Sequence, residues 1–168
     1  MFKKKMMLWV LIIIGLGIFS GCSSGIRFNI GYEDKGSNNR FVYTDDVAVF
    51  NLVKIINSLE ELKAFCDEVN NPAFNEESLN YSSDLSRKIR EYDETFFAEK
   101  SLIIYLTSHG DTSVSYSIKG LEIENEELLL DIRIKKHKGL FTHVFTPWVF
   151  IIEVNKEDIA GITNIRIS

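Results

Sequence analysis

Cysteine is scarce in this chain, and long apolar runs and clustered positive charge are scarce too. The 168 residues contain only two cysteines, Cys22 and Cys66. One pair of thiols excludes the framework of several disulfides that supports many small secreted domains. The longest apolar run, Met6 to Phe19, is 14 residues long, whereas a transmembrane helix needs about 20. The sequence therefore disfavours a disulfide scaffold and a permanent membrane-spanning anchor.

The charge balance excludes another class of function. Residues 1 to 21 carry three lysines and no acidic residue, and the remainder of the chain has 16 basic and 24 acidic residues, a net charge of −8. Nucleic-acid binding depends on clustered Lys and Arg, so we expect no nucleic-acid partner. An acidic domain is also held off an anionic membrane surface, and any attachment to a membrane must come from another feature.

The chain also has few residues suited to catalysis or metal binding. Its only histidines are His109, His137 and His143, and none of them belongs to a His-Glu-x-x-His zinc motif. The stretch from His109 to Ser113 contains the residue types of a catalytic triad, but His109-Gly110-Asp111 is typical of a turn between strands. His137 and His143 lack the further ligands that a zinc site needs. We therefore expect no catalytic residue, no metal and no cofactor.

The first 22 residues carry the most specific pattern. A basic segment, Lys3-Lys4-Lys5, precedes the apolar run, and the small residues Ser20 and Gly21 lead to Cys22. These are the parts of an export signal, and the cysteine makes the segment similar to the signal of bacterial lipoproteins. That resemblance implies cleavage between Gly21 and Cys22, acylation of the Cys22 thiol and anchoring of an extracytoplasmic domain to the cell membrane.

Residues 22–40 are predicted to be a lipidated tether. They are rich in Ser, Gly and Asn, with Gly36-Ser37-Asn38-Asn39 as the clearest flexible element. A coil of this length reaches roughly 25 Å, enough to lift a small domain off the lipid headgroups. An alternative stays open for Ile26 to Tyr32, which could form a short strand at the domain edge.

Residues 41–168 are predicted to form a single α+β domain, with one or two helices followed by a mostly antiparallel β-sheet or small sandwich. Ser58 and Glu61 fit a capping box at the start of a helix over Leu59 to Asn70, and a second helix is expected near Asp84 to Tyr92. Cys66 lies on the apolar stripe of the first helix, which favours a packed thiol over a reactive one.

The C-terminal half of the chain shows the period-two pattern of strands. Leu102 to Leu106 is a continuous apolar run, as in a central strand, and the segments from Val114 and from Leu128 alternate between apolar and polar residues. Hairpins are expected at Glu124 to Glu126 and at His137 to Gly139. Two further extended runs, Phe141 to Thr146 and Trp148 to Val154, are expected on either side of Pro147, which marks a strand end or an edge. A helical turn at Lys156 to Ile159 and a strand ending at Ile167 complete the predicted elements.

Two surface features have two interpretations each. Phe141, Phe145, Trp148 and Phe150 surround Pro147, and they would form a partner surface if exposed or part of the core if buried. The basic run Lys135-Lys136-His137-Lys138 could contact wall polymers or lipid headgroups, or could simply keep a hairpin tip solvated.

The stretch from Phe97 to the C-terminus resembles the C-terminal domain of the PrcB-like family, named for a lipoprotein subunit of a surface protease complex. The shared outline includes the apolar strand at Leu102 to Tyr105, Tyr116-Ser117-Ile118, the hairpin from Leu128 to Ile134, and Pro147-Trp148-Val149. The resemblance implies a noncatalytic accessory domain whose partner is a surface protein or protease. We therefore expect a binding or assembly module at the outer face of the cell membrane, with an envelope-associated hydrolase as the alternative.

Overall fold

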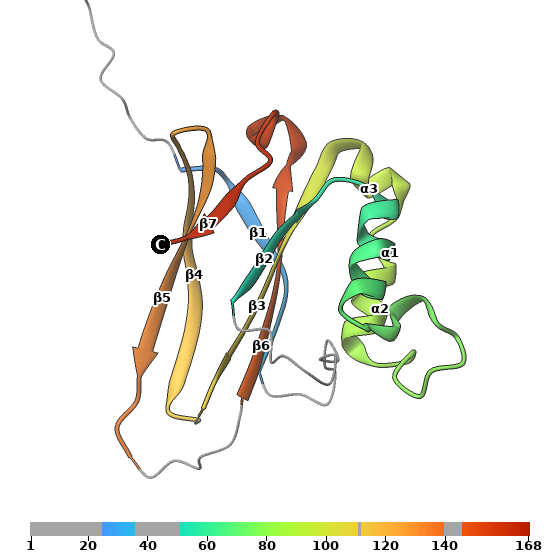
Figure 1. Cartoon of the computed structure of the whole chain (residues 1–168), viewed down its shortest axis with the longest axis horizontal. Coiled ribbons are helices and arrows are strands. Elements are labelled where there is room, and N and C mark those ends of the chain that lie inside the picture. The colour runs from blue at the N-terminus through green and yellow to red at the C-terminus, as the bar shows by residue number, and fades with distance from the viewer. Residues whose placement is uncertain (1–24, 36–50, 111, 140–145) are drawn as a thin grey trace, which may run out of the picture.

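The computed structural model describes residues 25–35, 51–110, 112–139 and 146–168. These residues form three layers: a group of helices, a four-stranded sheet and a three-stranded sheet (Figure 1). The four-stranded sheet lies in the middle, with the helices on one face and the smaller sheet on the other. The predicted α+β class with mostly antiparallel β structure is confirmed.

The four-stranded sheet forms the centre of the domain. Its strands, in the spatial order β1-β6-β3-β2, are β1 (Phe28–Lys35), β6 (Thr146–Asn155), β3 (Lys100–His109) and β2 (Leu52–Ile56). All neighbouring strands are antiparallel. The two inner strands are covered on both faces, which explains why β3 and β6 read as nearly continuous apolar runs in the sequence.

The three-stranded sheet covers one face of the larger sheet. It consists of β4 (Val114–Glu124), β5 (Glu127–Lys136) and β7 (Ile165–Ile167), with β4 and β5 antiparallel and β5 and β7 parallel. The predicted hairpin between β4 and β5 is confirmed, and its turn residues Asn125 and Glu126 have φ values of 52° and 65°. Positive φ at both positions is typical of the type I′ turn that favours hairpins.

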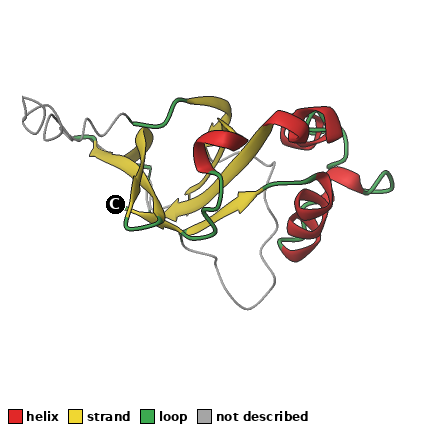
Figure 2. Ribbon diagram, turned by 90° about the horizontal axis from the view of Figure 1, so that it is seen from above, coloured by secondary structure: helices red, strands yellow, loops and turns green. Residues whose placement is uncertain are grey.

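The helices lie together on the other face, as Figure 2 shows from above. They are α1 (Leu59–Glu68), α2 (Asp84–Arg90) and α3 (Glu94–Glu99), with a short 3₁₀ helix at Pro72–Phe74. The predicted cap of α1 is confirmed: the Ser58 hydroxyl accepts a hydrogen bond from the Glu61 amide at 3.1 Å. The Glu61 carboxylate accepts from the Asn57 amide at 2.7 Å, one residue further back than in the usual capping box.

Two hydrophobic cores hold the layers together. Alternate residues of β3 point to opposite faces of the sheet. Leu102 and Ile104 pack against the helices, whereas Ile103 and Tyr105 pack against the three-stranded sheet. All four are at most 2 % exposed. The central sheet therefore contributes to both cores and joins the helices to the outer sheet.

The prediction that residues 22–40 form a tether is wrong for most of the residues of this range that the structure describes. Phe28–Lys35 is an edge strand, β1, paired with β6, and Ile26 donates a backbone hydrogen bond to Leu121 of β4 at 2.8 Å. The alternative of a strand at the domain edge is thus correct. A β-bulge at Gly31 interrupts the pairing between Ile30 and Tyr32, and it hides the alternating pattern of the strand in the sequence.

A second expectation is also wrong. The segment at His137 to Gly139 is no hairpin turn between paired strands, because β5 belongs to the three-stranded sheet and β6 to the four-stranded one. The chain therefore crosses from one layer to the other between them. The helical turn at Lys156–Ile159 and the last strand, β7, are confirmed. In the part of the chain that the structure describes, no helix has the length and apolar character needed to cross a bilayer.

Candidate functional site

The candidate site lies on the outward side of the β4–β5 hairpin. Tyr116 and Leu130 point into the core between the sheets. Because successive side chains of a strand point to opposite faces, the residues next to these two point to solvent. The strand register pairs Ser115 with Lys135 and Ser117 with Arg133. We call the resulting set the basic face. It consists of Ser115, Ser117, Arg133, Lys135 and His137.

The side chains of the basic face are accessible and rich in hydrogen-bond donors. Arg133, Lys135 and His137 are exposed, and the two serines are half-buried. Ser115 Oγ and His137 Nε2 lie 2.9 Å apart, and the His137 amide donates to the Ser113 carbonyl at 2.7 Å. Neither Arg133 nor Lys135 forms an ion pair with an acidic group of the described residues. The basic face can therefore offer two cations and two hydroxyls to an anion.

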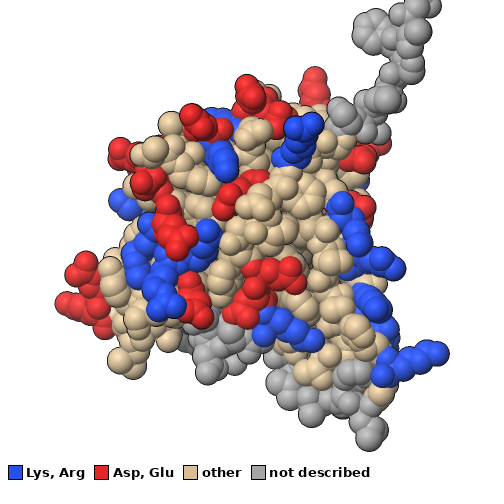
Figure 3. All heavy atoms as spheres, turned by 180° about the vertical axis from the view of Figure 1, so that it is seen from behind, with Lys and Arg blue, Asp and Glu red and all other residues tan. Residues whose placement is uncertain are grey.

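The opposite end of the same hairpin is acidic. Glu124 and Glu127 flank the turn, and Arg166 of β7 bridges them at 2.7 Å and 3.2 Å. Glu122 and Glu126 add two further carboxylates there. Figure 3 shows basic side chains along one edge of the molecule, and a second group of basic side chains interleaved with acidic ones on the opposite side. Charge is thus segregated along the hairpin.

A second polar cluster, centred on Glu153, lies between the helices and the central sheet. The Glu153 side chain is only 11 % exposed. It accepts a hydrogen bond from the Tyr92 hydroxyl at 3.1 Å and from Asn29 Nδ2 at 3.4 Å. Lys100 Nζ and Lys88 Nζ lie 3.6 Å and 3.9 Å from its carboxylate oxygens. The cluster joins β1, β6, β3 and α2 through one carboxylate.

The chemistry of this cluster is that of a structural network. Burial raises the pKa of Tyr92 well above its usual range, and the neighbouring Glu153 carboxylate raises that pKa further. Tyr92 therefore keeps its proton and remains a hydrogen-bond donor. The two lysines compensate the charge of Glu153, which a largely buried carboxylate requires.

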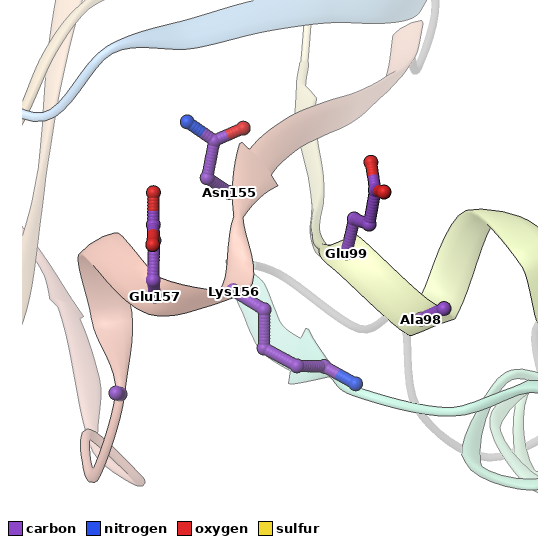
Figure 4. A pocket seen from close by; sticks show the side chains of 6 residues that line it. Ala98, Glu99, Asn155, Lys156 and Glu157 are labelled. Atoms are coloured by element: carbon purple, nitrogen blue, oxygen red, sulfur yellow. The ribbon is translucent and has the colours of Figure 1, made fainter.

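A hollow of about 550 Å³ lies where α3 meets the end of β6. Figure 4 shows Glu99 and Glu157 on opposite sides of it, with the Lys156 side chain directed away from Glu157. Lys156 Nζ donates to the carbonyls of Asn57 at 2.9 Å and Phe97 at 2.6 Å. Lys156, the only basic residue that lines the hollow, therefore stabilises the fold through these two hydrogen bonds. The exposed carboxylates of Glu99 and Glu157 are the other charged groups of the lining. Within the described ranges, no three His, Cys, Asp or Glu side chains are grouped to hold a metal ion.

The predicted partner surface needs correction. Trp148 is 5 % exposed and Phe150 is fully buried, because the inner strand β6 is covered on both faces. Trp148 and Phe150 stack at 6.0 Å between ring centroids, and the buried Trp148 indole N–H has no acceptor among the described residues. Both rings belong to the core. The other two members, Phe141 and Phe145, lie outside the described residues, as do the predicted cleavage and lipidation residues Gly21 and Cys22.

The histidine and serine candidates are placed as follows. Ser113 is 3 % exposed, so its hydroxyl is closed to a substrate, and His109 is half-buried at the end of β3. Asp111 and His143 lie outside the described residues. The structure instead brings His137 to Ser115, a pair that the sequence did not suggest because 22 residues separate them.

Cys66 is a packed thiol, as its helical position predicted. It is 1 % exposed, and burial raises its pKa from 9.0 to about 12, with a smaller contribution from the Asp67 charge. This difference corresponds to roughly 10³-fold less thiolate at a given pH below 9, and the thiolate is the reactive form.

We therefore expect Cys66 to resist alkylation. The Cys22→Ala variant has Cys66 as its single thiol, and iodoacetamide at pH 8 should label it only after a denaturant is added, as measured by mass spectrometry. Because the pKa of Cys66 is raised only in the folded state, the unfolded state releases the thiol proton at a lower pH. The free energy of unfolding should therefore fall as the pH rises from 9 toward 12. Rapid labelling of the native variant would contradict the buried placement.

Comparison with known proteins gives no further guide to function, since no family model, curated protein or solved structure matches the chain.

Proposed function

We propose that this chain is a noncatalytic surface lipoprotein, a binding or assembly module held at the outer face of the cell membrane by an acylated Cys22. The observation that carries the proposal is the export signal ending in Ser20-Gly21-Cys22, followed almost at once by a folded domain. Ile26, four residues after Cys22, already donates a hydrogen bond to Leu121 of β4. The anchor would therefore be attached directly to the domain.

The binding role is supported by the character of the exposed surface. The basic face is a positively charged region on a domain that is otherwise acidic, and its cations have no acidic partner among the described residues. The resemblance to the PrcB-like family favours a surface protein or protease as one partner of the domain.

The alternative, an envelope-associated hydrolase, has one observation in its favour. Ser115 Oγ and His137 Nε2 lie within hydrogen-bond distance at 2.9 Å. A triad also needs a carboxylate that orients the histidine through its second ring nitrogen, and none of the described carboxylates is hydrogen-bonded to His137. The pair lies on an exposed strand surface, and we favour the binding module.

The anchor is tested by metabolic labelling with an alkyne-bearing fatty acid. The wild-type chain and the matched control Ser23→Ala, which changes the next residue and keeps the thiol, should both incorporate the label. Cys22→Ala should incorporate none. Protease added to intact spheroplasts should digest the domain if it lies at the outer face. Label retained by Cys22→Ala, or a domain protected from the protease, would refute the proposal.

A further inference from the structure

The basic face has the chemistry of a phosphate site. Ser115 and Ser117 lie beside Lys135 and Arg133 in the strand register, so that each cation has a hydroxyl next to it. Arginine and lysine bind phosphate through charge-assisted hydrogen bonds, and the planar arginine can contact two phosphate oxygens at once. Serine hydroxyls can donate to the remaining oxygens. Neither Arg133 nor Lys135 forms an ion pair with a carboxylate of the described residues.

The spacing of these groups suits a linear ligand. Arg133, Lys135 and His137 occupy alternate positions, and alternate residues of a strand are roughly 6.8 Å apart. The backbone hydrogen bond from His137 to Ser113 extends the ladder one step past the end of β5. The row therefore presents repeated donors along one line rather than around one pocket.

The polarity of the face argues against a protein partner at this position. Protein interfaces are built around buried aromatic and apolar anchors with a polar rim. The basic face contains serine, arginine, lysine and histidine and no apolar side chain. A hydrated polyanion makes mainly charged and hydrogen-bonded contacts, and such a surface fits it better.

The placement of the anchor argues against the headgroups of the anchoring membrane, and this step rests on the proposed function. From Cys22 to Ile26 the chain spans at most about 14 Å, and Ile26 is fixed to Leu121, so the domain stays close to the membrane. In the strand register, Leu121 lies between the acidic turn and the basic face. Laying the hairpin flat on anionic headgroups would press Glu122, Glu124 and Asp131 onto them as well.

We propose that the basic face binds a linear polymer that carries a phosphate group in each short repeat and that surrounds the anchored domain. Arg133 and Lys135 bind successive phosphates, and Ser115 and Ser117 donate hydrogen bonds to them.

Inorganic polyphosphate is the probe that tests this assignment. The full chain in neutral detergent micelles should bind a fluorescently labelled polyphosphate, with the affinity read from anisotropy at increasing salt. Arg133→Glu combined with Lys135→Glu should weaken binding about ten-fold, within the limit of about 25-fold set by two exposed ion pairs that contribute up to about five-fold each. Salt should weaken binding of the wild type more steeply than of this variant, because fewer counterions are released without these contacts.

The control is a charge reversal of equal size on the helical side of the domain. Lys63→Glu combined with Arg87→Glu changes two exposed basic residues and should leave the affinity within about two-fold. Arg133→Gln with Lys135→Gln keeps the proposal testable if the reversed variant misfolds, which circular dichroism would reveal.

Three results would overturn the proposal. Equal loss of affinity in the control variant would show that only net charge matters. Polyglutamate of the same length binding as tightly as polyphosphate would point to an acidic protein segment. Binding of the basic face to phosphatidylglycerol vesicles, lost in the Arg133 and Lys135 variants, would assign it to a membrane. Failure of polyphosphate binding leaves acylation of Cys22 unaffected, so the two proposals fail separately.

Discussion

Replacing Phe150 with alanine should lower the free energy of unfolding by about 3–5 kcal/mol, the usual cost of truncating a fully buried phenylalanine. The Phe150 ring is 0 % exposed. It stacks on Tyr105 at 5.9 Å and on Trp148 at 6.0 Å between ring centroids. Neighbours on a central sheet strand cannot easily collapse into the space left behind. The melting temperature should fall by roughly 10–15 °C in calorimetry.

Phe96→Ala is the matched control for this variant. Phe96 is only half-buried, on α3 beside Tyr92, so the same truncation should cost less than half as much. Equal losses for the two variants, or a loss below about 1 kcal/mol for Phe150→Ala, would contradict the packing of the two sheets around Phe150.

Gly31→Ala should destabilise the domain by about 2–3 kcal/mol, a typical cost of forcing an extra group into a packed site. A Cβ at Gly31 would overlap the Tyr92 hydroxyl and the Glu153 carboxylate. Tyr92 is 2 % exposed and packs against Phe96 at 4.7 Å between centroids, so its ring has little freedom to withdraw. The substitution should therefore break the Tyr92–Glu153 hydrogen bond, and chemical denaturation would measure the loss.

A double-mutant cycle tests the cause of this effect. Tyr92→Phe removes the hydroxyl that the new Cβ would meet, so it should cost less in the Gly31→Ala background than in the wild type. Gly110→Ala is the control, since a Cβ there meets nothing within 4 Å, and it should change stability by less than about 0.5 kcal/mol. Additive effects of Gly31→Ala and Tyr92→Phe would show that they act independently.

Local signals in the sequence were sufficient to predict much of the fold. The Ser58 cap, the apolar run of β3 and the alternation of β4 and β5 all depend on neighbours close in the chain. The β1 strand was harder to predict because the bulge at Gly31 shifts its pattern by one residue, placing Ile30 and Tyr32 in different cores. The crossing from β5 to β6 depends on which sheet each strand joins, and no local pattern specifies that.

The candidate site could be predicted only in part. The basic run beginning at Lys135 could be recognised in the sequence. The sequence did not show that Lys135 faces outward while its neighbour Lys136 lies on the other side of the strand. Ser115 and Ser117 could be assigned to the site only from the pairing of β4 with β5 in the structure. A bulge between Ile118 and Gly120 shifts this pairing by one residue, which the sequence does not reveal. The sequence left two interpretations open for Trp148 and Phe150, a partner surface or the core, and the core interpretation is correct. The sequence could not decide between them because burial on both faces of β6 depends on the layers above and below it.

The most direct test of the account is the mass of the N-terminal peptide of the protein purified from the membranes of its own cells. We predict a chain that begins at Cys22 and carries a diacylglyceryl group on the Cys22 sulfur, with residues 1–21 removed. A chain that retains Met1, or one cleaved elsewhere with an unmodified Cys22 thiol, would contradict the lipid anchor and the surface function that depends on it.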